Sequence, residues 1–112
     1  MVKINATNEI RLNDVFVNIW GYDQTNANFY QVVGRTDKMI IVREIAKTVP
    51  EEKGFMTGDV MPIRNRFIGS PVRRRPYRYG AGSSLSGTIY LPSEYGSAQL
   101  WDGKPVNVSW YA

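Results

Sequence analysis

Short segments that alternate in polarity and end at turn residues constrain the fold of this chain more than any other feature. In DVFVNIW (14–20) the β-branched residues fall on one face of a strand and the remaining residues on the other: Val15, Val17 and Ile19 against Phe16, Asn18 and Trp20. A period of two predicts a strand, whereas a helix repeats its apolar residues every three to four positions. Helical periodicity is poor along nearly the whole chain.

Further segments of the same kind follow at regular spacing, bounded by turn residues: NFYQVVGRT (28–36), KMIIVREIA (38–46), GDVMPIRN (58–65) and SGTIYLP (86–92). Thr36 and Asp37 form a link short enough for a tight hairpin. Pro62 lacks a backbone donor, which restricts its strand to a sheet edge or a bulge. One alternative stays open, a short helix or single turn around residues 47–53.

The C-terminal segment predicts a hairpin. Asp102-Gly103 separates AQLW from KPVNVSWYA, and this dipeptide favours a type I′ turn because both central residues need positive φ. The alternation after the turn then directs Val106, Val108 and Trp110 inward.

Strands of this length and spacing are typical of small antiparallel all-β folds. The sequence therefore predicts one domain over residues 1–112, either an SH3-like barrel or a rolled sheet, with its strands at about 14–64 and 86–111. An Arg/Gly/Ser-rich insertion at about 64–87 is expected to form a long basic hairpin or flap beyond the barrel.

Positive charge is concentrated in that insertion. The net charge of the chain is +4, but no acidic residue lies between Asp59 and Glu94, where six arginines give a local charge of +6: Arg64, Arg66, Arg73, Arg74, Arg75 and Arg78. The segment contains no lysine. A guanidinium is a planar donor suited to phosphate oxygens and to aromatic rings, so the pattern indicates an anionic partner.

Tyrosines are interleaved with these arginines. If residues 72–79 form one strand, Arg73, Arg75, Tyr77 and Tyr79 share a face. Such a face suits a nucleic acid, because arginines contact phosphates and aromatic rings stack on bases. In the alternative interpretation the two tyrosines cover the core and the arginines extend into water.

A second candidate contact surface is WGYDQTNANFYQVV (20–33). If Val15, Val17 and Ile19 fill the core, then Phe16, Trp20 and Tyr22 lie on the outer face. There they are either covered by other parts of the chain or exposed as a protein contact, with Trp20 or Tyr22 as its anchor.

The sequence gives little support for catalysis or for metal binding. The chain has no histidine and no cysteine, which excludes imidazole bases, thiolate nucleophiles and the usual zinc ligands. We therefore expect a binding protein that is not an enzyme and needs no cofactor. No apolar run approaches the roughly 18 residues of a membrane span, and no signal peptide is recognisable, so no membrane association is expected.

WGYDQTNANFYQVV, the strand MIIVREI and the ending LWDGKPVNVSWYA together resemble a group of small proteins from phages, prophages and conjugative elements. The resemblance implies a gene on a mobile element that acts in the bacterial cytoplasm, and it transfers no site residues. The hypothesis is a non-enzymatic nucleic-acid binder. The alternatives are an inhibitor that binds a host defence protein (an anti-CRISPR or similar nuclease inhibitor) and a sponge for a cyclic or other small anionic nucleotide, with a homo-oligomer possible.

Overall fold

The computed structural model describes residues 2–21, 24–54, 56–81, 84–85, 88–93 and 96–110. In this part of the chain strands dominate, α-helices are absent, and the 3-10 helix η1 (Thr7–Glu9) is the single helical turn. The thirteen strands are β1 (Val2–Asn5), β2 (Val15–Trp20), β3 (Asn26–Arg35), β4 (Ile40–Lys47), β5 (Glu51–Gly54), β6 (Thr57–Val60), β7 (Pro62–Phe67), β8 (Val72–Arg74), β9 (Tyr77–Ala81), β10 (Ser84–Leu85), β11 (Tyr90–Ser93), β12 (Gly96–Leu100) and β13 (Val106–Ser109). The predicted all-β class is confirmed.

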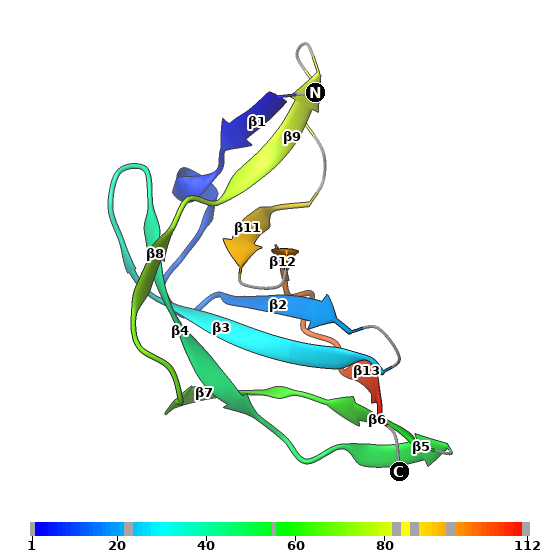
Figure 1. Ribbon diagram of the computed structural model, residues 1–112. Coiled ribbons are helices and arrows are strands. Elements are labelled where there is room, and N and C mark those ends of the chain that lie inside the picture. Colours follow the sequence, from blue (N-terminus) through cyan, green and yellow to red (C-terminus); the bar gives the residue numbers. More distant parts are fainter. Residues whose placement is uncertain are drawn as a thin grey trace.

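Two antiparallel sheets form the molecule. Ten strands make a large sheet in the order β1-β9-β11-β12-β2-β3-β4-β7, to which β8 adds by pairing with β4 and β10 by pairing with β9. The strands β13, β6 and β5 make a small sheet. In Figure 1, β1 and β9 lie at the opposite end of the molecule from β7 and the small sheet. Within the described residues the two ends of the large sheet are not paired, so the fold is a rolled open sheet rather than a closed barrel.

Core clusters lie on both faces of the central strands β2, β3 and β4, because these strands carry apolar residues on both sides. One face packs in a cluster around Phe16 and Val32, which Leu91 of β11 joins. The other face packs around Phe29, and Val108 of β13 covers it from the small sheet. The small sheet therefore completes the second core.

The predicted alternation in β2 is correct at its start and wrong at its end. Val15 and Val17 belong to one core cluster and Phe16 to the other. Phe16 is thus covered rather than exposed. Ile19 was expected in the core but is 56% exposed, because it lines an open groove with Pro105.

Three local predictions between β3 and β7 have clear outcomes. A tight hairpin does join β3 to β4, but it is centred on Asp37 and Lys38, since the Thr36 N–H donates to the Met39 carbonyl over 2.8 Å. The alternative helix around 47–53 is wrong: residues 40–47 and 51–54 are strands. Pro62 opens β7 at the edge of the large sheet, as its missing N–H requires.

The predicted hairpin at Asp102-Gly103 does not form. β12 pairs with β2 and β11, whereas β13 pairs with β6 in the other sheet. Gly103 has a φ of 86°, but Asp102 does not have a positive φ; instead its carboxylate accepts the Lys104 N–H at 2.9 Å. Trp101 packs edge-on against Phe29, with ring centroids 6.2 Å apart. Phe29 is buried and Trp101 is half-buried, and their contact favours the path of the chain from one sheet to the other.

The basic insertion is not a flap beyond the sheet. Residues 72–74 pair with β4 as β8, and residues 77–81 pair with β1 as β9. Residues 84–85 return beside β9 as β10; residues 82–83 and 86–87 lie outside the described residues. Of the helical structure described, nothing has the length and apolar composition needed to cross a membrane.

Candidate nucleic-acid interface

Strands β7 and β8 together form one outer edge of the large sheet. Both pair with β4, and no second strand partner is found for either among the described residues. The link between them is held against β4, because the N–H groups of Ile68 and Gly69 both donate to the Glu44 carbonyl, at 2.9 and 3.3 Å. A Cβ on Gly69 would lie 3.0 Å from the Glu44 Cβ, so glycine permits this close approach.

This edge carries five arginines, which we call the basic edge: Arg64 and Arg66 on β7, Arg73 and Arg74 on β8, and Arg75 directly after β8. None of the five forms an ion pair with an acidic side chain in the part of the chain that the structure describes. Four of them are exposed: Arg64, Arg66, Arg73 and Arg75. Five cations along one strand edge, uncompensated by described carboxylates, suit a linear anion.

Two members of the basic edge are held in place. The Arg64 Nε donates to the Asn13 carbonyl at 3.1 Å, and its guanidinium lies 5.7 Å from the centre of the Trp101 ring. Arg74 is half-buried, and its Nη1 donates to the Arg73 carbonyl at 2.8 Å. These contacts limit the freedom of the two side chains, and so reduce the entropy lost when they bind a ligand.

Arg78 differs from the other five arginines of the segment. It lies on β9 and binds the Glu9 carboxylate through two nitrogens, with Nη2–Oε1 at 2.8 Å and Nε–Oε2 at 2.9 Å. A bidentate pair of this kind neutralises the guanidinium. The structure therefore separates Arg78 from the basic edge.

The Glu9–Arg78 pair predicts a pH dependence of stability. Hydrogen bonds from Arg78 lower the pKa of the Glu9 carboxyl in the folded protein. The stabilisation is therefore present above the unfolded-state pKa of about 4.3 and is lost as the pH falls through the lower folded-state pKa. We expect Glu9→Gln to lower the free energy of unfolding at pH 7 by at most about 1 kcal/mol, because the pair is partly exposed, and to have less effect near pH 2.

Urea denaturation at both pH values measures this difference. The matched control is Asp37→Asn, which removes one exposed carboxylate from a turn and should change stability little. An equal loss at both pH values for Glu9→Gln would contradict the assignment.

The tyrosines of the segment do not form the expected face with the arginines. Tyr77 is only 5% exposed, and its hydroxyl lies 3.0 Å from the Ser97 hydroxyl. Its ring contacts Tyr79 and Tyr90, with centroids 5.3 and 5.7 Å away. The predicted strand over 72–79 is interrupted between β8 and β9. Arg73 and Arg75 therefore do not share one continuous strand face with Tyr77 and Tyr79. The interpretation in which tyrosines cover the core is the correct one for Tyr77.

Trp20 and Tyr22 were the candidates for a protein contact. Trp20 is half-buried, and its indole Nε1 donates to the Asn28 side-chain oxygen. Tyr22 lies outside the described residues. Trp20 is therefore engaged within the fold.

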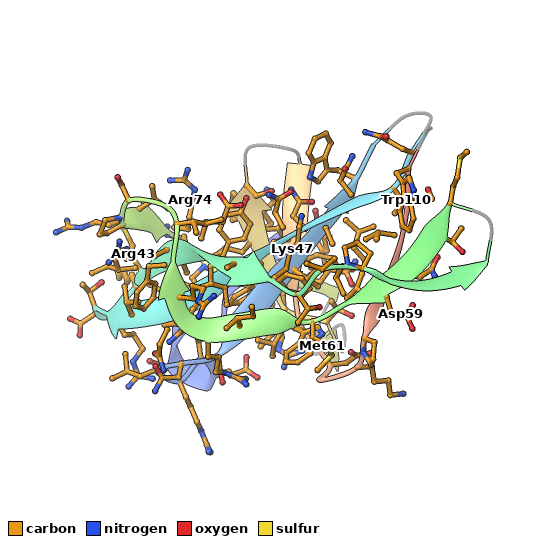
Figure 2. All side chains as sticks on the ribbon, turned by 90° about the horizontal axis from the view of Figure 1, so that it is seen from below. Arg43, Lys47, Asp59, Met61, Arg74 and Trp110 are labelled. Carbon is orange, nitrogen blue, oxygen red and sulfur yellow. The ribbon has the colours of Figure 1, made fainter. Side chains whose placement is uncertain are left out.

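Two charged residues beside the basic edge were not singled out in the sequence. The Arg43 guanidinium lies 4.5 Å from the centre of the Phe67 ring, and its Nε donates to the Gly69 carbonyl at 2.8 Å. Glu44, the next residue of β4, faces the opposite side of the sheet. In the sequence, only the alternation within β4 indicates that Arg43 and Glu44 lie on opposite faces of the sheet. It does not show which strand lies beside β4, so the contacts of the two residues could not be predicted. Figure 2 shows Arg43 and Arg74 at the end of the molecule away from Asp59 and Trp110.

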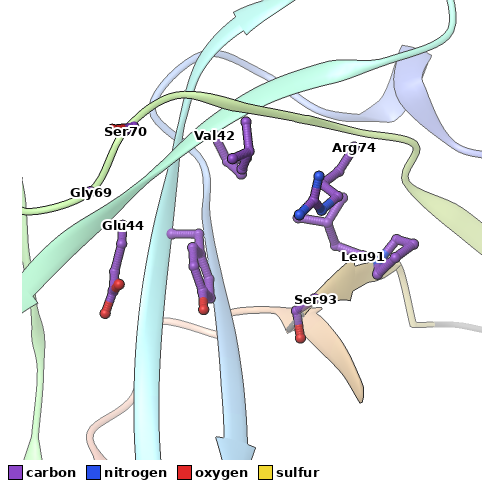
Figure 3. Close-up of a pocket in the computed structure, with 10 residues that line it drawn as sticks. Val42, Glu44, Gly69, Ser70, Arg74, Leu91 and Ser93 are labelled. Carbon is purple, nitrogen blue, oxygen red and sulfur yellow. The ribbon is translucent and has the colours of Figure 1, made fainter. Parts of the chain in front are cut away.

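A pocket of about 220 Å³ opens beside β8, on the side of the sheet that Arg74 faces. Its walls include Tyr30 and Glu44 from the central strands, Arg74 from β8, and Leu91 and Ser93 from β11. In Figure 3, Arg74 and Glu44 enter the pocket from different strands, with Ser93 on the side of β11. The pocket thus combines a cation, an anion and an aromatic wall.

Within the described ranges, no three potential metal-ligating side chains come together. Comparison with protein-family models, with curated proteins and with solved structures finds no match for this chain, so its function has to be inferred from the basic edge and the adjoining pocket.

Proposed function

We propose that this protein is a non-enzymatic nucleic-acid binder that contacts a phosphate backbone along the basic edge. The observation that carries the proposal is a row of five arginines, with no ion pair to a described carboxylate, along two strands that continue one edge: Arg64 and Arg66 on β7, Arg73 and Arg74 on β8, and Arg75 directly after β8. An extended nucleic acid presents phosphates at regular intervals and can follow such an edge. The earlier resemblance to proteins of mobile elements is consistent with a role in DNA or RNA handling in a bacterial cell.

Charged side chains also protect a sheet edge from pairing with another chain, so a protective role has to be distinguished from binding. The basic edge contains only arginines, although lysine is the more frequent protective residue. Four of these arginines, Arg64, Arg66, Arg73 and Arg75, are exposed and require no rearrangement of the fold to reach phosphates.

Salt dependence distinguishes the two roles. If all five arginines neutralise phosphates, log K falls with log salt with a slope of about −3.5 for a single strand and about −4.5 for a duplex. Between 50 and 200 mM salt the affinity should then fall about 100-fold for a single strand and roughly 500-fold for a duplex. Fluorescence anisotropy with labelled mixed-sequence oligonucleotides of both kinds measures these slopes.

A matched pair of double variants locates the contact. Arg66→Ala with Arg73→Ala removes one exposed cation from each strand of the basic edge, and should reduce the single-strand slope by about 1.4. Arg11→Ala with Lys104→Ala removes the same charge from exposed sites elsewhere and should leave the slope nearly unchanged. Equal effects of the two double variants would contradict the proposed interface.

Absence of binding at 50 mM salt, or binding that does not respond to salt, would overturn the proposal. The arginines would then either protect the sheet edge from pairing with another chain or serve a different partner, such as a host nuclease that this protein inhibits. Trp20 does not favour that alternative, because its indole is already hydrogen-bonded within the fold.

A further inference from the structure

The pocket beside the basic edge holds two opposite charges that do not pair with each other. Glu44 and Arg74 both line it, yet no ion pair joins them within the described part of the chain. Both side chains are half-buried. Each has a hydrogen bond within the chain, Glu44 from Asn28 and Arg74 to the Arg73 carbonyl, but neither forms an ion pair with a described residue. Removing a charge from water without an opposite charge is costly, so the arrangement suits a ligand that supplies one charge-complementary edge to each group.

The Glu44 carboxylate is oriented before any ligand arrives. The Asn28 Nδ2 donates to its Oε2 at 2.8 Å, and the Asn28 side-chain oxygen in turn accepts a hydrogen bond from the Trp20 indole. The backbone of Glu44 is held by Ile68 and Gly69. No described group donates to Oε1. A carboxylate fixed on one side by this chain is preorganised to accept donors on the other.

Arg74 supplies the opposite chemistry. A guanidinium presents paired N–H donors, and a carboxylate presents paired acceptors. A ligand that satisfies both therefore needs two adjacent donors on one edge and two adjacent acceptors on another. Glu44 and Arg74 do not form an ion pair with each other, so the donor edge and the acceptor edge of the ligand have to be set apart. The part of the ligand between these edges would lie along Tyr30 and the apolar wall at Leu91.

Guanine meets this description. Its N1–H and N2–H groups are adjacent donors, and its O6 and N7 are adjacent acceptors that arginine recognises as a pair. Adenine lacks the paired donors, and the pyrimidines lack the N7 acceptor. The volume of about 220 Å³ is smaller than the roughly 300–1,000 Å³ of sites for drug-sized ligands, so it suits one base rather than a larger molecule.

We infer that this pocket binds one guanine base, with Glu44 accepting from N1–H and N2–H and Arg74 donating to O6 and N7. The base belongs either to a free nucleotide or to a strand that follows the basic edge; the second case rests on the proposed function. Single-stranded nucleic acids are commonly read in this way, through bases turned out against an aromatic side chain and hydrogen-bonded along their edges.

Titration calorimetry with mononucleotides tests the pocket independently of strand binding. GMP should bind at least about 5-fold more tightly than IMP, which lacks the 2-amino group, than 7-deaza-GMP, which lacks N7, and than AMP. Glu44→Gln should abolish the preference for GMP over IMP, and Arg74→Gln the preference over 7-deaza-GMP. Arg11→Ala is the matched control, because Arg11 is an exposed arginine that neither lines the pocket nor belongs to the basic edge, and its removal should leave both preferences intact.

Anisotropy with oligothymidylate, with and without one internal guanine, distinguishes a free nucleotide from a strand. Tighter binding of the guanine-containing strand, lost in Glu44→Gln, places a strand base in the pocket. GMP binding without strand binding supports the pocket and overturns the proposed function. Salt-dependent strand binding with equal affinities for GMP and AMP, or with no GMP binding at millimolar concentration, leaves the proposed function and overturns the guanine site.

Discussion

Phe29→Ala is expected to lower the free energy of unfolding by about 3–5 kcal/mol. The Phe29 side chain has no exposed surface and lies at the centre of β3, paired with Val17 and Ile45 on its two sides. Its ring also meets the Trp101 ring edge-on at 6.2 Å. The truncation therefore removes apolar contact with both sheets and leaves a cavity where they meet.

A domain of this size is stable by only about 5–15 kcal/mol, so this loss should lower the melting temperature by roughly 12 °C or more. Thermal and urea denaturation followed by circular dichroism measure it. Ile19→Ala is the matched control, because it truncates an apolar residue on the same face of the adjacent strand that is 56% exposed; it should cost less than about 1 kcal/mol. Similar losses for the two variants would show that Phe29 is not a core residue.

Gln31→Leu is expected to lower the free energy of unfolding by about 1–3 kcal/mol, although leucine is more apolar than glutamine. Gln31 is only 1% exposed. Its Nε2 donates to the side-chain oxygens of Asn13 and Asn65 at 2.9 and 3.0 Å, and its Oε1 accepts the Asn65 N–H at 2.7 Å. Leucine leaves three groups on these two residues without their bonds: the side-chain oxygens of Asn13 and Asn65 and the Asn65 N–H.

The effect should also be local, because Asn13 and Asn65 both have positive φ, 73° and 69°, and the Gln31 amide holds these two backbone positions together. Amide hydrogen exchange should become faster around both residues in Gln31→Leu. Gln31→Glu is the comparison variant: it keeps the acceptor for the Asn65 N–H but removes the donor.

A carboxyl buried at position 31 should have a raised pKa. The penalty of Gln31→Glu should therefore be small below the unfolded-state pKa of about 4.3 and should grow as the pH rises above it. A penalty that does not change with pH, or an unchanged stability in Gln31→Leu, would contradict the role assigned to this network.

Local patterning predicted the strands well wherever neighbouring residues decide the outcome. The alternation at Val15, Phe16 and Val17 follows from the pleat of a strand, and these residues do divide between the two core clusters. Pro62 marks an edge for a similarly local reason. The exposure of Ile19 was not predictable from the sequence. It depends on the open groove that Ile19 lines with Pro105, and Pro105 lies far from Ile19 along the chain.

The candidate site was predicted only in part. The concentration of arginine between residues 59 and 94 is visible in the sequence, but its division into a basic edge, an ion pair at Arg78 and a buried Tyr77 is not. That division depends on partners far away along the chain. β8 pairs with β4, Arg78 of β9 binds Glu9, and Tyr77 of β9 lies opposite Tyr90. The pocket was not predicted, since Glu44 and Arg74 are thirty positions apart.

The sequence by itself determined the all-β class, the positions of the central strands and the uneven distribution of charge, because each of these depends on residue type and on spacing over a few positions. Tertiary structure alone decided where the chain turns and where it crosses. Asp102-Gly103 has the composition of a hairpin turn, but burying Trp101 against Phe29 directs the chain into the second sheet. The half-buried Trp101 ring gains apolar contact and an edge-on ring pair with Phe29 when the chain crosses between the sheets, and this tertiary packing lies outside what the local turn preference can report.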